Sequence, residues 1–351
     1  MQTPRGIARI PDLGSFDQII DTRSPAEFAE DHIPGAINCP VLDNAQRAQV
    51  GTIYKQVSAF EARKLGAAMV AENIARHLMT HFQDQPKDWR PLLYCWRGGQ
   101  RSGSFTTWMR MIGWDACQLE GGYKTYRRHV IDQIAALPPT LRFVVVCGAT
   151  GSGKTRLLDA LAAAGAQVLD LEGLARHKGS VLGRLPGIAQ PPQKSFETAL
   201  HEKLAGYSPE RPVFVEAESR KIGSIQIPEA LIERIRQSEC VAIEASRAAR
   251  LDFLLNDYAY LGHDVADFKE RIDCLRGFQS NSVLDEWKRL AEVGDLATLF
   301  AAFIDEHYDP LYQRSQNRNF VRFGEARPIV LETLSADQLA AAAADLIQSL
   351  T

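Results

Sequence analysis

Short apolar runs alternate with longer stretches of helical periodicity along the first 140 residues. The runs that predict strands are 18–22, 36–39, 91–94 and 116–119. The stretches that predict helices are 25–31, 64–82, 102–112 and 126–136. Strands that alternate with helices are typical of an α/β domain with a mainly parallel sheet.

Two adjacent prolines, Pro138 and Pro139, interrupt this pattern. They cannot continue the helix predicted before them, and a β-branched apolar run at 141–148 follows. We therefore expect one domain over residues 1–137 and a second over 141–351.

The alternation resumes after the prolines and then gives way to helix. The predicted strands are 141–148, 167–170, 212–216 and 240–244, and a helix is expected over 154–164. Residues 248–351 have a largely helical pattern. The second domain is therefore expected to contain a parallel sheet followed by a largely helical C-terminal part.

Residues 148–155 read Gly-Ala-Thr-Gly-Ser-Gly-Lys-Thr and match the phosphate-loop pattern G-x-x-x-x-G-K-[ST] in full. A buried strand before them and a helix after them supply the context that the loop needs. The candidate phosphate-binding residues are Gly148, Gly151, Ser152, Gly153, Lys154 and Thr155. The glycines allow backbone amides to cradle an anion, Lys154 would contact the outer phosphate, and Thr155 could bind Mg²⁺. This motif indicates a di- or triphosphate without choosing between them.

Acidic and basic residues follow the neighbouring predicted strands. Asp170 and Glu216 are the candidate acidic partners of the loop, because each ends a strand. The residues Glu218, Ser219 and Arg220 come next and are expected to support the site at the carboxyl edge of the sheet. Arg247 and Arg250, which follow a later strand, could reach the same phosphates.

Cys95 begins a second loop between a strand and a helix, with the sequence Cys-Trp-Arg-Gly-Gly-Gln-Arg-Ser over 95–102. The amides of such a loop can surround an anion beside the sulfur, so Cys95 is the candidate nucleophile. The candidate anion-binding residues are Arg97, Gly98, Gly99, Gln100 and Arg101. The other five cysteines are expected to be packing residues, and the absence of a C-x-x-C pair favours reduced thiols.

Composition and charge narrow the class of protein. Apolar residues make up 45% and charged residues 24% of the 351 positions, as in an ordinary globular protein. No apolar run approaches the roughly 18 residues that span a bilayer, and no signal peptide is visible, so we expect a cytoplasmic protein. The net charge of −3 excludes a uniformly basic nucleic-acid binder, although residues 95–128 form a locally basic stretch.

Residues 21–40 (Asp-Thr-Arg-Ser-Pro-Ala-Glu-Phe-Ala-Glu-Asp-His-Ile-Pro-Gly-Ala-Ile-Asn-Cys-Pro) resemble the first signature of a rhodanese domain. Residues 119–123 (Leu-Glu-Gly-Gly-Tyr) resemble a later element of that fold. The resemblance implies that Cys95 corresponds to the catalytic, persulfide-forming cysteine. An extra glycine gives the spacing C-x5-R, which also occurs in rhodanese-like phosphatases, so sulfur, selenium and phosphate all remain open.

The fusion of this domain to a P-loop NTPase-like domain resembles the tRNA 2-selenouridine synthase family across essentially the whole chain. Further matching stretches are 94–99, 171–175, 177–180 and 216–223. The resemblance implies a transferase that exchanges the sulfur of wobble 2-thiouridine in tRNA for selenium from selenophosphate. It also implies an S-geranyl intermediate made from geranyl diphosphate. It suggests no tightly bound cofactor, and it makes an enzyme that supplies selenophosphate a candidate partner.

Other functions are compatible with the residues alone. One is an ATP-using sulfurtransferase, another is a nucleotide-regulated C-x5-R phosphatase, and a third is a binding protein with the P-loop as a switch. An RNA partner would need the basic stretch at 95–128 together with Arg220 and Lys221, and Trp96 could stack on a base.

Overall fold

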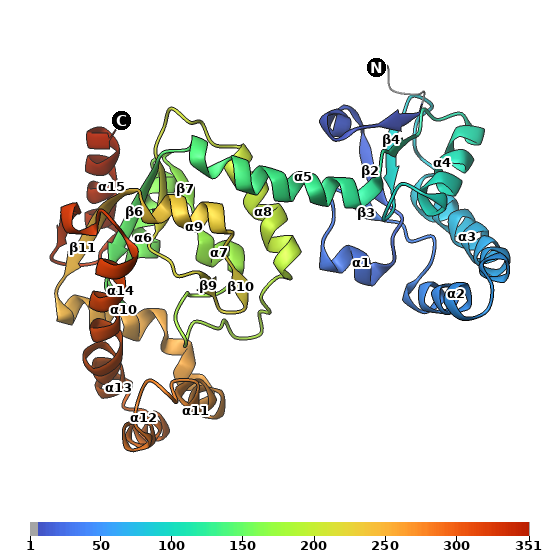
Figure 1. Cartoon of the computed structure of the whole chain (residues 1–351). Helices are drawn as coiled ribbons and strands as arrows, with labels where there is room; N and C mark the ends of the chain where they lie inside the picture. Colours follow the sequence, from blue (N-terminus) through green and yellow to red (C-terminus); the bar gives the residue numbers. More distant parts are fainter. Residues whose placement is uncertain (1–5, 351) are drawn as a thin grey trace. The chain divides into compact units, whose positions relative to one another are not determined.

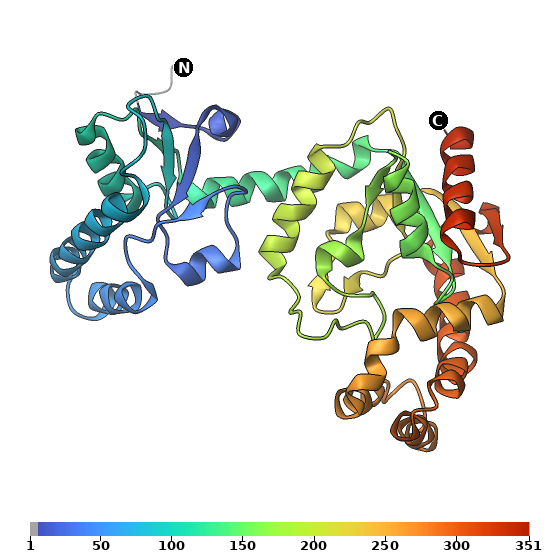
Figure 2. The same ribbon diagram turned by 180° about the vertical axis from the view of Figure 1, so that it is seen from behind.

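The computed structural model describes residues 6–350, apart from the side chains at positions 313, 315 and 317 (Figures 1 and 2). The chain forms two compact units, Met1–Gln133 and Ile134–Thr351. The first five residues, on which the expectation about a signal peptide rests, lie outside the described part. None of the helices within 6–350 has the length and apolarity that crossing a bilayer requires.

The first unit is built on a five-stranded parallel sheet, as the alternating pattern predicts. Its strands are β1 (Ile7–Ala8), β2 (Gln18–Asp21), β3 (Ile37–Asn38), β4 (Pro91–Tyr94) and β5 (Cys117–Leu119). They pair in the order β1-β5-β4-β2-β3. The strand β4 lies at the centre, and all four of its residues are buried. Its carboxyl end, where Cys95 follows, is therefore held firmly.

Five α-helices accompany this sheet. They are α1 (Pro25–Glu30), α2 (Asn44–Gln56), α3 (Ala59–His81), α4 (Gln100–Ile112) and α5 (Gly122–Ala136), and a 3₁₀ helix, η1, covers Ile10–Ser15. The core packs Ile20 and Leu93 of the sheet against Phe105 and Met109 of α4 and Ile74 of α3. The sequence pattern did not predict α2. Since α2 has no fully buried residue, it lacks the apolar periodicity that reveals a helix.

The second unit contains another five-stranded parallel sheet. Its strands are β6 (Phe143–Gly148), β7 (Gln167–Leu169), β8 (Val213–Glu216), β11 (Glu239–Ala245) and β12 (Arg327–Leu331), in the order β12-β11-β6-β8-β7. A small hairpin joins β9 (Lys221–Ile222) to β10 (Ile225–Gln226). The prediction that residues 248–351 are largely helical is confirmed, and β12 is a strand within this part that the pattern did not predict. Its apolar residues pair with β11 at the sheet edge, a long-range contact that local periodicity does not show.

Alternate residues of β6 pack into two separate cores. Val144 and Val146 contact α6 (Lys154–Ala163) and α15 (Ala336–Leu350) on one face. Phe143 and Val145 face α7 (Leu171–Ala175), α8 (Gln193–Ala205) and α9 (Glu229–Arg236) on the other. These helices are labelled around the sheet in Figure 1. Both faces are covered, which is why β6 is a continuous apolar run.

A third apolar cluster contains residues of α10 (Arg247–Asp257), α11 (Val265–Asp273), α12 (Asn281–Val293) and α13 (Leu296–Ala302). The helix α14 (Asp309–Asn319) follows these helices in the chain. The segments η2 (Pro138–Thr140), η3 (Ala259–His263) and η5 (Phe323–Glu325) are short 3₁₀ helices, and η4 (Phe303–Tyr308) is a π-helix. Trp287 lies fully buried in this cluster, edge-on to Phe303 with ring centroids 4.8 Å apart.

The six cysteines are free thiols in different environments. Cys39, Cys95, Cys147 and Cys240 are buried, whereas Cys117 is half-buried and Cys274 is exposed. The expectation that all five cysteines other than Cys95 serve packing is therefore wrong for Cys274. That residue caps the C-terminal end of α11, and its side chain points to solvent.

Candidate functional site

Cys95 lies at the carboxyl end of β4, under a loop that closes at the N-terminus of α4. Its Sγ accepts hydrogen bonds from the backbone N–H of Gly99 at 3.3 Å and the hydroxyl of Ser102 at 3.2 Å. Both donors belong to the start of α4, where the helix dipole also favours negative charge. The same donors and the helix N-terminus could also bind an anion beside the sulfur.

Two glycine segments make the close packing around this loop possible. Gly98 and Gly122 both have positive φ, at +64° and +62°. A Cβ on Gly122 would lie 2.3 Å from the carbonyl oxygen of Cys95 and 2.5 Å from the amide nitrogen of Gly98. The start of α5 completes the enclosure, because Tyr123 N–H donates to Cys95 O at 2.8 Å.

A buried ionic network holds the start of α5, which is hydrogen-bonded to the Cys95 loop. The Arg23 guanidinium is 1% exposed, binds the Asp21 carboxylate at 2.6 Å and lies 3.8 Å from the ring centroid of Tyr123. Tyr123 in turn donates to Asp31 at 2.6 Å. The network ties the start of α5 to the end of β2, so the loop has a rigid base.

Arg101, the last residue of the C-x5-R pattern, is paired with an acid. Its guanidinium binds Glu27 of α1 at 2.9 Å, and Arg47 binds the same carboxylate at 2.9 Å. Although burial opposes the change, the hydrogen bond from Arg101 lowers the pKa of Glu27. The other residues assigned to this loop lie where the sequence places them: Arg97 is exposed between Cys95 and the glycines, and Gln100 begins α4.

The phosphate loop joins β6 to α6 in the second unit. Gly151 and Gly153 both have φ of +81°, and Gly153 is the residue that precedes the first turn of α6. Lys154 folds back over the loop and donates to Gly148 O at 2.8 Å. Ser152 is 1% exposed, whereas Thr155 is exposed at the helix start.

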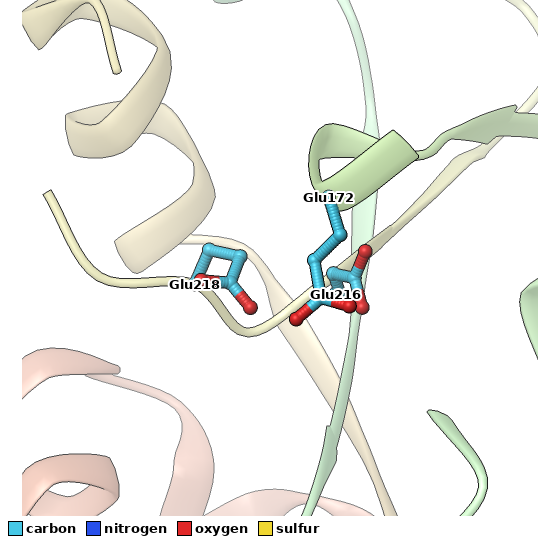
Figure 3. A group of neighbouring side chains, drawn as sticks. All are labelled: Glu172, Glu216 and Glu218. Carbon is cyan, nitrogen blue, oxygen red and sulfur yellow. The ribbon is translucent and has the colours of Figure 1, made fainter. Parts of the chain in front are cut away.

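Three glutamates that line the same cavity as the loop, or are buried behind it, lie close to one another, and Figure 3 shows these three side chains. Glu172 comes from α7, Glu216 ends β8, and Glu218 follows two residues later; their carboxylate oxygens lie within 4.8 Å of one another. Burial and the charge of Glu218 raise the pKa of Glu172 to about 8. Burial and the charge of Glu216 raise the pKa of Glu218 to about 8 as well. Glu216 is fully buried, and burial together with the charge of Glu172 raises its pKa well above the ordinary value.

The donor set of this cluster fits a hard divalent cation. Mg²⁺ and Ca²⁺ prefer oxygen ligands, and carboxylates that repel one another when charged are stabilised by a cation between them. Lys154 is a nearby positive charge that lowers the pKa of all three glutamates against the dominant effect of burial. The cluster and the phosphate loop therefore form one charged site.

Several predicted site residues have partners within the protein. Asp170 caps α7 by accepting from Gly173 N–H at 2.7 Å, and Glu172, two residues later, joins Glu216 and Glu218 in the acidic group. Arg220 pairs with Glu229 of α9, and Ser219 donates to the backbone oxygen of Lys221 at 2.5 Å.

The two arginines expected to reach the phosphates differ from each other. Arg247 binds Asp305 on the surface at 2.5 Å. Arg250 is 7% exposed, binds Asp309 at 2.5 Å and donates to Thr150 O in the phosphate loop at 2.9 Å. Arg250 therefore positions the loop through its backbone, and Arg247 does not contact it.

A cavity of about 520 Å³ opens above the phosphate loop. Lys154, Thr155, Glu172 and Glu218 line one side of it, together with Lys178. Lys178 binds Asp257 at 2.6 Å and lies 4.4 Å from the ring centroid of Tyr258. The cavity thus combines phosphate-binding groups with aromatic side chains.

Arg23, Glu27, Ser102 and Glu172 are among the residues of these sites that the sequence analysis did not select. Glu27 and Ser102 could have been found from local patterns. Ser24 and Glu27 form the S-x-x-E capping box at the start of α1, and Ser102 directly follows the C-x5-R pattern. Arg23 and Glu172 act through contacts with distant segments, which a local motif does not show.

Family models match both units. A rhodanese-like domain matches residues 8–129, and the tRNA 2-selenouridine synthase AAA domain matches residues 141–291. A tRNA 2-selenouridine synthase of Cupriavidus necator is 35% identical over 91% of this chain and 94% of its own length. The chain belongs to the tRNA 2-selenouridine synthase family.

Two further members of the family show how widely the similarity extends. The tRNA 2-selenouridine synthase of Nitrosomonas europaea is 37% identical over 71% of this chain and 68% of its own length. That of Sulfurovum sp. is 32% identical over 87% of this chain and 90% of its own length. Family membership confirms the expected architecture of a rhodanese-like domain followed by a P-loop-type domain.

Proposed function

We propose that this chain is a transferase that replaces the sulfur of wobble-position 2-thiouridine in tRNA by selenium from selenophosphate. The reaction would proceed through S-geranyl-2-thiouridine, made from geranyl diphosphate. One observation carries the proposal: a chain of this family holds both a loop in which Gly99 N–H donates to Cys95 Sγ and a sequence that matches the phosphate-loop pattern at Gly148–Thr155.

The chemistry explains why two anion sites would be needed. Sulfur is a poor leaving group from C2 of the base. In the first step the sulfur attacks C1 of the geranyl group, the C–O bond breaks, diphosphate leaves and the base loses its N3 proton. The alkylated sulfur can then depart as geranyl thiol when selenium attacks C2, and hydrolysis releases phosphate from selenium.

We assign the diphosphate to the P-loop unit. Lys154, the loop amides and the start of α6 would bind the leaving diphosphate, whose negative charge grows as the C–O bond breaks. Glu172, Glu216 and Glu218, with Thr155, would hold Mg²⁺, which would neutralise charge on the diphosphate. A Lys154→Ala variant is expected to lose geranylation while retaining its fold.

We assign the selenium donor to the rhodanese-like unit. The loop amides, Arg97 and Arg101 would bind selenophosphate, and Cys95 would lie beside its selenium as that selenium attacks C2 of the base. A Cys95→Ser variant is expected to form S-geranyl-2-thiouridine and to stop there. Cys274→Ser, at an exposed cysteine, serves as the matched control.

The deciding experiment is nucleoside analysis of tRNA from cells that lack this protein. Loss of 2-selenouridine with accumulation of 2-thiouridine is expected, and the wild-type gene should restore it. Unchanged 2-selenouridine would exclude the proposed function. Complementation with the Lys154→Ala and Cys95→Ser genes then assigns each step to a unit, because the first should leave 2-thiouridine and the second the geranylated base.

A further inference from the structure

Charged and apolar side chains both line the cavity above the phosphate loop. The charged ones are the cations and carboxylates described above. The apolar and aromatic ones come from α10, η4, α14 and two flanking segments, which also contribute Asp257, His307 and Gln316. We call the apolar and aromatic set the apolar wall, and its members are Val181, Phe253, Leu254, Tyr258, Tyr308, Leu311, Tyr312 and Phe320. A ligand that has both a charged part and an apolar part would match this lining.

The apolar wall begins directly at the phosphate loop. A Cβ on Gly151 would lie 2.9 Å from Leu254 Cγ, so this leucine touches the loop backbone. The Arg156 guanidinium, one residue beyond Thr155, lies 4.9 Å from the ring centroid of Phe253. An anion held by the loop would thus place whatever is attached to it against hydrocarbon.

The backbone on this side is unusual. The segment η4 is a π-helix, a form that is rare and is often found at functional sites. It ends at Tyr308, and α14 then places Leu311 and Tyr312 along the same wall.

Two members of the apolar wall have partly solvent-exposed side chains. Leu311 is 37% exposed and Val181 is 42% exposed, although both line the cavity. Covering such surface stabilises a complex by roughly 25 cal/mol for each Å² buried. The side chains of Leu311 and Val181 offer no hydrogen bonds, so these two positions favour contact with an apolar group.

We propose, on the basis of the function proposed above, that the apolar wall binds the isoprenoid chain of the diphosphate substrate. In this arrangement the phosphate loop fixes the diphosphate, and the chain lies along Leu254, Tyr308 and Leu311. Val181 and Leu311, the most exposed members, determine which chain length fits. The selectivity of this enzyme for its alkyl donor is therefore a property of the P-loop unit.

Calorimetric titration of the full chain with geranyl diphosphate and with inorganic diphosphate tests the wall. Geranyl diphosphate should bind at least about tenfold more tightly, because only its chain contacts the wall. Leu311→Ala and Val181→Ala should each weaken geranyl diphosphate by about threefold to tenfold and leave inorganic diphosphate unchanged. Val330→Ala, an exposed valine of β12 that does not line this cavity, should change neither affinity.

Chain-length preference is the second measurement. With a 2-thiouridine stem-loop RNA as acceptor, Leu311→Trp should favour dimethylallyl over geranyl diphosphate, and Leu311→Ala should admit farnesyl diphosphate. Equal binding of geranyl and inorganic diphosphate by the wild type would overturn the proposal that the apolar wall binds the isoprenoid chain. ATP binding that Leu311→Ala weakens would also overturn it, since the apolar wall would then bind a nucleoside.

The outcomes separate this inference from the function on which it rests. If the wall variants weaken geranyl diphosphate binding but no alkyl group is transferred to the RNA, the role of the apolar wall is supported and the proposed reaction is excluded. If the RNA is geranylated but none of the wall variants changes affinity or chain-length preference, the reaction is supported and the role of the apolar wall is excluded.

Discussion

Gly122 shows how strongly one missing Cβ constrains the Cys95 loop. Its φ of +62° strains any other residue, and a Cβ would collide with the backbone of Cys95 and Gly98. We expect Gly122→Ala to destabilise the first unit by about 2 to 4 kcal/mol, the sum of left-handed strain and overpacking. Urea unfolding followed by tryptophan fluorescence measures this, because four of the five tryptophans lie in that unit.

Gly35→Ala separates strain from collision. Gly35 has a similar φ of +75°, but nothing lies within 4 Å of the position of its Cβ. The cost there should be only about 1 to 2 kcal/mol. If both variants lose the same stability, the close approach of the two glycine segments does not hold the loop.

The glutamate cluster makes stability depend on pH. In the unfolded chain these carboxyls titrate near their ordinary pKa of 4.5, whereas in the folded state Glu172 and Glu218 titrate at about 8. The folded protein therefore retains protons that the unfolded chain releases between these values. The stability that the protonated forms contribute is complete below about pH 4.5 and is lost as the pH rises toward 8. Each retained proton corresponds to about 1.4 kcal/mol per pH unit.

Urea unfolding at two pH values, with and without Mg²⁺, tests the cluster. Between about pH 5.5 and 7.5 without metal, the wild type should lose about 3 kcal/mol per retained proton relative to a Glu172→Gln/Glu218→Gln variant. Added Mg²⁺ should stabilise the wild type more at the higher pH, since it binds deprotonated carboxylates. Glu286→Gln, at an exposed carboxylate of α12, should behave as wild type. An equal effect of Mg²⁺ on the wild type and the double variant would contradict the expectation that the glutamate cluster binds a cation.

At the scale of elements, Arg250 links α10 to both α14 and the phosphate loop. Removing it leaves Asp309 without its cation and Thr150 O without its donor. We expect Arg250→Met to reduce the free energy of unfolding of the second unit by about 3 to 5 kcal/mol and to weaken diphosphate binding. The measurements are urea unfolding followed by far-UV circular dichroism, and calorimetric titration with inorganic diphosphate.

Arg247→Met is the matched control for that element. Arg247 lies on the same helix, one turn earlier, and pairs with Asp305 on the surface. Surface pairs contribute little to stability, so neither unfolding nor diphosphate binding should change measurably. A similar loss in both variants would mean that α10 is sensitive to any substitution and that the buried pair has no special role.

The elements that could be predicted from the sequence are those that their own residues determine. Strand β6, the phosphate loop and helix α6 are adjacent in the chain, and each leaves a local signal of burial, glycine or periodicity. Strand β12 and Glu172 could not be found in this way. The first is a strand only because β11 lies beside it, and the second joins the site only because α7 follows β7 at the same sheet edge as β8. Such placement follows from topology, which periodicity does not encode.

At the scale of the whole molecule, charge determines where RNA can bind. Residues 1–140 carry 16 basic and 14 acidic side chains, and residues 141–351 carry 24 and 29. The net charge of the chain therefore does not attract a polyanion such as RNA, and a local basic surface must provide the attraction. Lys124 and Arg128 lie four residues apart on α5, so they share one exposed face of that helix. The backbone N–H of Lys124 donates to Trp96 O at 2.9 Å, which places this face beside the Cys95 loop.

We therefore expect Lys124 and Arg128 to contact the phosphates of the tRNA. Replacing both with glutamine should weaken binding of 2-thiouridine tRNA and reduce the slope of log affinity against log salt by about 1.4 to 1.8, the value for two lost phosphate contacts. Fluorescence anisotropy between about 50 and 200 mM salt measures the slope. Lys269→Gln with Arg289→Gln removes the same charge from exposed positions of α11 and α12 and should leave the slope unchanged. Equal slopes for the two double variants would show that RNA responds to net charge alone and that the α5 face is not its binding surface.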